Sequence, residues 1–129
     1  MTRMKEKLEL EYSVNVPPNI LFSRLSTPSG LAEWFADDIY VQENIFRFIW
    51  SNAEQQAKLL HRKKNQCIRF KWVDDEDHQS YFEFRIAKDE LTGDVALIIT
   101  DFVADEEKED TIELWDTQIS SLKLALGVS

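Results

Sequence analysis

The sequence predicts an α+β protein in which a curved antiparallel sheet of about six or seven strands wraps around one long C-terminal helix. Between residues 42 and 103, polar and apolar side chains alternate in short segments, a pattern typical of strands with one face toward water. Near the end of the chain, apolar side chains recur at steps of three and four: Ile112, Trp115, Ile119, Leu122 and Leu126. That spacing places them on one face of a helix, which can cover the other face of the sheet.

The chain begins with a strand followed by two short helices. Residues 5–14 alternate and predict a half-buried strand whose inward side chains are Leu8, Leu10, Tyr12 and Val14. Pro17 and Pro18 end this strand and open a helix over residues 19–25, because proline suits the first turn of a helix. Pro28 starts a second short helix with Thr27 as its cap. The apolar face of that helix comprises Leu31, Trp34 and Phe35.

Five further strands are expected after an acidic loop at residues 36–44, which itself holds a short strand at residues 39–41. They cover residues 45–50, 54–61, 66–72, 80–88 and 94–103. Alternation turns aromatic side chains inward on three of these strands: Phe46, Phe48 and Trp50, then Phe70 and Trp72, then Phe82 and Phe84. The last segment is almost continuously apolar, which predicts a central strand covered on both faces.

Both ends of the long helix carry terminal signals. Asp110 and Glu113 have the spacing of a capping box, and Gly127 is suited to end the helix as its C-cap. The chain shows no internal repeat, low-complexity segment or linker. We therefore expect one domain over residues 1–129, with its core at residues 5–127.

Three blocks of the sequence resemble a known family. Residues 16–35 combine a double proline, a helix, a Thr-Pro pair and a Trp-Phe pair, and residues 68–72 form a strand that ends in tryptophan. In the closing helix, Leu114-Trp115-Asp116 precedes residues 122–127. These blocks are similar to the START-like superfamily, also called SRPBCC, and to its branch of homologues of the activator of the heat-shock chaperone ATPase. The resemblance implies the helix-grip fold of the birch-pollen allergen, which hosts lipid carriers, cyclases, hydrolases and co-chaperones.

A ligand is expected in the space between the sheet and the C-terminal helix. The side chains predicted to line this space are Phe46, Phe48, Trp50, Phe70, Trp72, Phe82, Phe84, Trp115 and Ile119. The rings either fill the space as a core or line a cavity of roughly a few hundred cubic ångströms that takes an apolar ligand with one polar end.

Two polar groups are candidates for the same space. His61 shares the alternation of Ala57 and Leu59, so it points either into the cavity or, near a turn, toward solvent. Asp101 interrupts an apolar strand, where it is either a cavity acid with a raised pKa or a residue that faces water at the strand end.

The composition limits the classes of partner. The chain has 24 acidic and 15 basic residues and a net charge of −9, which disfavours nucleic acids and anionic membrane surfaces as partners. The basic run at residues 61–64 is interpreted as a solvated hairpin turn. Cys67 has no second cysteine with which to pair and lies in an apolar run, which predicts a buried and inert thiol.

Signatures of catalysis are missing from the sequence. It has no serine elbow, Cys–His signature or glycine-rich phosphate loop, and its two histidines, His61 and His78, are isolated from each other. We therefore expect no catalytic residue, no metal ion and no cofactor. The N-terminus lacks a signal-peptide pattern and no apolar run is long enough for a membrane span, so a cytoplasmic monomer or homodimer is expected.

Three functional hypotheses follow. The first is a non-enzymatic START-like module that binds a small hydrophobic ligand. The second is a protein-interaction or regulatory domain related to chaperone ATPase activators, and the third is a cyclase-like or hydrolase-like enzyme. The first hypothesis requires space for a ligand among the aromatic rings, whereas the third requires two or more polar groups that converge in that space.

Overall fold

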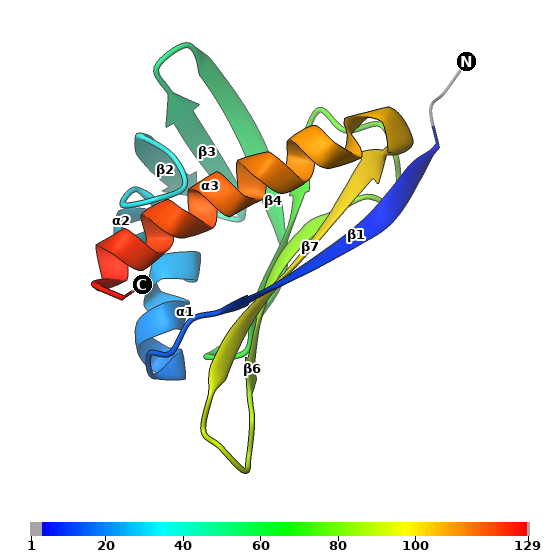
Figure 1. The fold of residues 1–129 in the computed structure, drawn as a ribbon. Coiled ribbons are helices and arrows are strands. Elements are labelled where there is room, and N and C mark those ends of the chain that lie inside the picture. The colour runs from blue at the N-terminus through cyan, green and yellow to red at the C-terminus, as the bar shows by residue number, and fades with distance from the viewer. Residues whose placement is uncertain (1–3, 129) are drawn as a thin grey trace.

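The computed structural model describes residues 4–128, which form a curved antiparallel sheet with one long helix across its concave face (Figure 1). The strands are β1 (Lys5–Ser13), β2 (Asp38–Gln42), β3 (Ile45–Trp50), β4 (Ala53–Lys63), β5 (Cys67–Trp72), β6 (Phe82–Lys88) and β7 (Val95–Ala104). Their order in the sheet is β1-β7-β6-β5-β4-β3-β2, so β1 and β2 are its two edges. This confirms the predicted sheet of six or seven antiparallel strands.

The helices are α1 (Pro18–Ser26), α2 (Pro28–Leu31) and α3 (Lys108–Leu126), and a 3-10 turn, η1 (Asp105–Glu107), precedes α3. The first two begin where the sequence predicts, but α2 ends at Leu31, so Trp34 and Phe35 lie in the turn that follows it and not on a helix face. α1 packs against β5 and β6, and α2 packs against β2. The two short helices thus connect one edge strand to the other, and α3, orange to red in Figure 1, crosses the sheet in the helix-grip arrangement. Over residues 4–128, no helix combines the length and the apolar character needed to cross a bilayer.

A tight corner joins α1 to α2 and positions the segment that follows. The Thr27 hydroxyl oxygen accepts a hydrogen bond from the Gly30 backbone N–H at 3.0 Å and donates to the Ser23 carbonyl oxygen at 2.6 Å. This confirms Thr27 as the predicted cap. Gly30 is buried, and a Cβ atom at this position would lie 2.1 Å from the Ser23 carbonyl oxygen, so the corner requires glycine. From here the chain turns through residues 32–37 toward β2.

The predicted apolar face of α3 is turned toward the sheet. The buried residues of this helix are Trp115, Ile119 and Leu122. Gly127 ends the helix with a φ of 74°, a left-handed conformation that glycine adopts at low cost, which confirms the predicted C-cap. The predicted capping box is wrong, because the helix begins at Lys108 and leaves Asp110 within its first turn. Acidic side chains in that turn still interact favourably with the helix dipole.

β7 lies between β1 and β6 and is covered differently on its two faces. On the inner face its apolar side chains belong to the core. On the outer face Thr100 is buried, as is Glu83, its partner across the β6–β7 pairing. The Glu83 carboxylate forms ion pairs with Arg69 at 2.8 Å and Arg85 at 3.2 Å. Side chains of β5 and β6 therefore help to cover the outer face of β7, which the sequence predicts to be covered on both faces.

Candidate functional site

The aromatic side chains predicted to face the interior come together between the sheet and α3. The buried members of the predicted set are Phe46, Phe48, Phe70, Phe82, Phe84, Trp115 and Ile119, and the half-buried ones are Trp50 and Trp72. Ring centroids are 5.1 Å apart in the Phe70–Phe82 pair and 4.7 Å apart in the Trp72–Phe82 pair. These separations are normal for contacting aromatic rings. We call this set, together with Trp34 and Phe35, the aromatic cluster.

Phe35 lies at the centre of the aromatic cluster. Its centroid is 5.1 to 6.2 Å from those of Trp34, Phe48, Trp50, Phe82, Phe84 and Trp115. Phe35 was predicted on the apolar face of a short helix and was not among the predicted cavity-lining residues. Its spacing from Leu31 was a sufficient signal for burial, but its contacts with β3, β6 and α3 are nonlocal and leave no local signal.

A hollow of about 350 Å³ opens at the surface beside Phe35. We call it the mouth hollow, and its lining comes from three parts of the chain: residues 32–37, Trp50 at the end of β3, and Leu114, Gln118 and Ser121 of α3. Phe35 is therefore shared, because it lines the mouth hollow and also occupies the centre of the aromatic cluster.

Two indole groups hold the segment that carries Phe35. The Trp50 indole N–H donates to the Phe35 carbonyl oxygen at 2.9 Å, and the Trp34 indole N–H donates to the Arg24 carbonyl oxygen at 2.7 Å. The first bond ties the backbone of the α1–β2 connection to β3, and the second ties the Trp34 side chain of this connection to the backbone of α1. The backbone at the mouth hollow is thus anchored by a hydrogen bond, whereas the Phe35 side chain is held by packing contacts, among them those with six aromatic rings.

Asp101 lies on the inner side of β7 beneath α3. The Trp115 indole N–H donates to one carboxylate oxygen at 2.9 Å, and the Phe102 backbone N–H donates to the other at 2.8 Å. Burial raises the pKa of Asp101, and the two hydrogen bonds oppose this effect without cancelling it. The carboxylate ties β7 to α3, and a second tie is the Tyr12 hydroxyl, which donates to Asp116 of α3 at 2.7 Å.

The structure places His61 toward solvent, which is the second of its two predicted positions. Leu59 pairs with Phe70 and His61 pairs with Arg69, so the register shifts between them and the alternation is reversed at Leu60. Such a bulge turns every following side chain to the opposite face. His61 is consequently exposed on the outer face, whereas Asp101 lies on the inner face. The two candidate polar groups therefore do not meet.

Within residues 4–128, no three side chains of His, Cys, Asp or Glu are grouped to hold a metal ion. Cys67 is a free and buried thiol, as the sequence predicted.

Comparison with known proteins identifies the family. A family model described as a START-like superfamily domain matches residues 1–128. The solved structure of protein BfR322 from Bacteroides fragilis is 41% identical, with a TM-score of 0.67, and the match covers 97% of this chain and 93% of that chain. No curated protein matches the sequence.

Two more distant structures share the fold. The Aha1 dimer from Colwellia psychrerythraea is 15% identical, with a TM-score of 0.71 and coverage of 94% of this chain and 92% of that one. Protein MLL2253 from Mesorhizobium loti is 14% identical, with a TM-score of 0.77 and coverage of 95% and 97%. At these identities the likeness concerns the fold alone.

Proposed function

The chain belongs to the START-like superfamily, and on that premise we propose that it is a non-enzymatic module that binds a small, largely apolar ligand. The ligand enters at the mouth hollow, and its apolar end displaces the Phe35 ring and packs against the aromatic cluster. The observation that supports this most is the position of Phe35, which separates the surface hollow from the aromatic interior. START-like folds host many activities, so the proposal rests on this geometry and not on the fold.

The lining of the mouth hollow indicates the chemistry of the ligand. Its volume of about 350 Å³ is at the lower end of the range for small-molecule sites. The rings of Trp34, Phe35 and Trp50 supply apolar walls, and Gln118 and Ser121 supply an amide and a hydroxyl. The carboxylate of Asp37 and that of Glu33, which forms an ion pair with Arg24, also border the hollow. These groups favour a neutral or cationic polar end over a carboxylate.

The positions of the polar candidates favour binding over catalysis. Acid–base chemistry needs two or more groups that converge on the reacting atoms. His61 and Asp101 lie on opposite faces of the sheet, and both carboxylate oxygens of Asp101 already accept hydrogen bonds from Phe102 and Trp115. Asp101 is therefore assigned to fold stability in this proposal.

A matched pair of leucines on α3 tests the binding site. Leu114 is 58% exposed and lines the mouth hollow, whereas Leu124 is 81% exposed and lies outside its lining. Tryptophan fluorescence should report titration with medium-chain alcohols, alkylamines and fatty acids, because Trp34 and Trp50 line the hollow. We expect Leu114→Glu to weaken binding at least about tenfold and Leu124→Glu to leave it unchanged, since a buried charge costs more than roughly 1.4 kcal/mol.

Two results would contradict the proposal: wild-type protein that binds none of these probes, or equal losses in the two variants. The regulatory alternative is tested separately, by adding the purified chain to a bacterial heat-shock chaperone of the class that such activators act on. An increase in its ATPase rate would favour a role like that of the chaperone activators over small-ligand binding.

A further inference from the structure

We propose that the free edge of β2 is a docking site for an extended peptide, which joins the sheet as an additional strand and carries a basic residue at each end. This site borders the mouth hollow at Asp37, lies otherwise on a different part of the molecule and does not depend on the proposed ligand. The peptide forms main-chain hydrogen bonds with β2, as in other cases where an extended segment adds to an exposed sheet edge.

The two edges of the sheet differ in how they are protected. β1 carries five charged residues among its nine: Lys5, Glu6, Lys7, Glu9 and Glu11. Charges of this kind are a common means of preventing unwanted strand pairing at an edge. β2 has no charge, proline or bulge between Ile39 and Gln42, and its register with β3 is uninterrupted. Of the two edges, β2 is therefore the one that can accept a further strand.

Large side chains on both sides of β2 are exposed. Tyr40 is 53% exposed and Val41 is 40% exposed, and as neighbours in a strand they point to opposite faces of the sheet. An additional strand beside β2 would cover part of each. Paired coverage of this kind is what a strand-shaped partner provides, whereas a globular surface would contact one face at a time.

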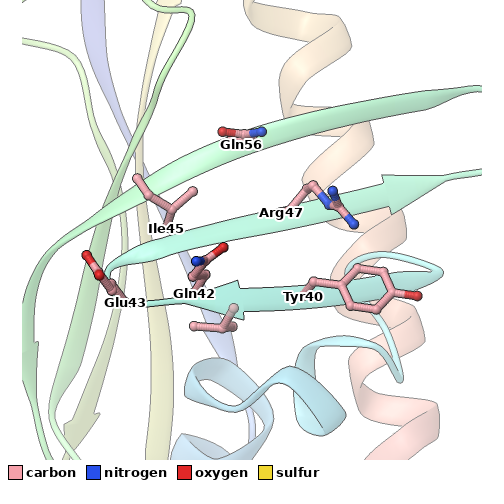
Figure 2. Close-up of a pocket in the computed structure, with 7 residues that line it drawn as sticks. Tyr40, Gln42, Glu43, Ile45, Arg47 and Gln56 are labelled. Atoms are coloured by element: carbon pink, nitrogen blue, oxygen red, sulfur yellow. The ribbon is translucent and has the colours of Figure 1, made fainter.

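A hollow of about 490 Å³ lies beside this edge. We call it the edge hollow, and Figure 2 shows Tyr40 and Arg47 toward one end and Glu43, at the β2–β3 turn, at the other. Gln42 and Gln56 also line it. The edge hollow lies on the outer face of the sheet. The side chains of Tyr40, Gln42 and Arg47 point to this face, opposite to the buried side chains of Phe46 and Phe48. A side chain of the added strand that points outward would occupy it.

The groups around the edge hollow specify that side chain. The Arg47 guanidinium lies 4.9 Å from the Tyr40 ring centroid and 3.2 Å from a carboxylate oxygen of Glu54, so its charge is already compensated. The other polar groups of the lining are the amides of Gln42 and Gln56, the Tyr40 hydroxyl and, at the β2–β3 turn, the Glu43 carboxylate. An uncharged polar side chain, such as glutamine or serine, suits these partners better than an acidic one.

Charge at the ends of β2 specifies the ends of the peptide. Asp37 and Asp38 lie at the start of the strand, and Glu43 follows its last residue. A basic residue at each end of the added strand therefore meets an acidic group. A second copy of this chain is a poorer partner, because antiparallel self-pairing centred on Tyr40 places Asp37 opposite Glu43 of the second copy.

The probe is a seven-residue peptide with a lysine at each end and alternating valine and glutamine between them, blocked at both termini and carrying a fluorophore. Binding is measured by fluorescence anisotropy, and the bound edge is identified by amide hydrogen exchange. We expect slower exchange at β2 amides and unchanged exchange at β1. In the variant Asp38→Lys/Glu43→Lys, affinity for the lysine peptide should fall at least about tenfold. A peptide with glutamates in place of the terminal lysines should bind this variant more tightly than it binds the wild-type protein.

Control variants separate this proposal from the previous one. Glu9→Lys changes a charge on the opposite edge, and Leu114→Glu changes the mouth hollow, so both should leave peptide binding unaltered. Peptide binding that is absent, protects β1 or survives the charge reversal would overturn the proposal. Protection of β2 that appears with rising protein concentration in the absence of peptide would also overturn it, and would assign the edge to a second copy.

Discussion

At the scale of single residues, Phe35 matters most because the packing of the interior converges on it. Its ring contacts side chains from β3, β6 and α3, and it is the point where the mouth hollow meets the aromatic cluster. A buried aromatic ring in such a position contributes both apolar burial and ring–ring contacts. Stability and access to the interior are therefore expected to change together when it is altered.

Truncation of Phe35 tests this. We expect Phe35→Ala to lower the free energy of unfolding by roughly 3–5 kcal/mol, because it leaves a cavity among packed rings. Urea titration monitored by circular dichroism measures the change, and Tyr40→Ala, at an exposed ring, is the control. The folded variant should also bind small apolar probes more tightly than wild type. A loss of stability no greater than that of the control would refute the central role of Phe35.

Asp101 gives a pH-dependent prediction. Burial raises its pKa in the folded state above the unfolded value of about 3.9. The group therefore stabilises the fold when protonated, and this contribution is lost as pH rises through the folded pKa. Asp101→Asn cannot ionise but can still accept the Trp115 indole hydrogen bond. The stability of Asp101→Asn relative to wild type should therefore decrease as pH falls from 7 to 4, and urea midpoints for both proteins measure it. A pH-independent difference would contradict the assignment.

At the scale of elements, the α1–α2 corner controls the mouth hollow. Gly30 packs against backbone atoms of α1, and residues 32–37, which line the hollow, follow directly. Gly30→Ala should destabilise the fold by roughly 1–3 kcal/mol, since the new Cβ meets main chain and not a flexible side chain. It should also weaken ligand binding. Thermal unfolding compared with Ser29→Ala, at an exposed neighbouring position, measures the effect, and equal melting temperatures would disprove it.

At the scale of the whole molecule, the two hollows share no lining residue and involve different faces of the sheet. The mouth hollow involves α3 on the concave face, whereas the edge hollow lies on the outer face of β2, β3 and β4. The net charge of −9 acts on both, because it favours basic or neutral partners over anionic ones. Binding of the lysine peptide at the exposed edge should accordingly weaken with added salt more than binding of a neutral ligand at the mouth hollow.

Much of the fold could be predicted from the sequence because the signals were local. The spacing of Trp115, Ile119 and Leu122 defines a helix face, and the alternation around Phe46 and Phe48 defines a strand face, whatever the rest of the chain does. The contacts within the candidate site could not be predicted in this way, because they join segments that are distant in the sequence. Phe35 was assigned to an apolar face, yet its partners lie on elements far away in the sequence. The role of the predicted lining residues in ligand binding stays a prediction.

The sequence by itself determined which faces are apolar, where proline and glycine interrupt the helices, and the imbalance of charge, since each depends on residues within a few positions or on simple sums. Only the tertiary structure decided that His61 faces outward, that Phe35 occupies the centre of the rings, and that β2 is a free edge. Two of these depend on how strands pair: a register shift at Leu60 reverses His61, and the strand order leaves β2 with a single neighbour. The position of Phe35 depends on how the α1–β2 connection packs against β3, β6 and α3. Pairing joins segments that are distant in the chain, so no local pattern encodes it.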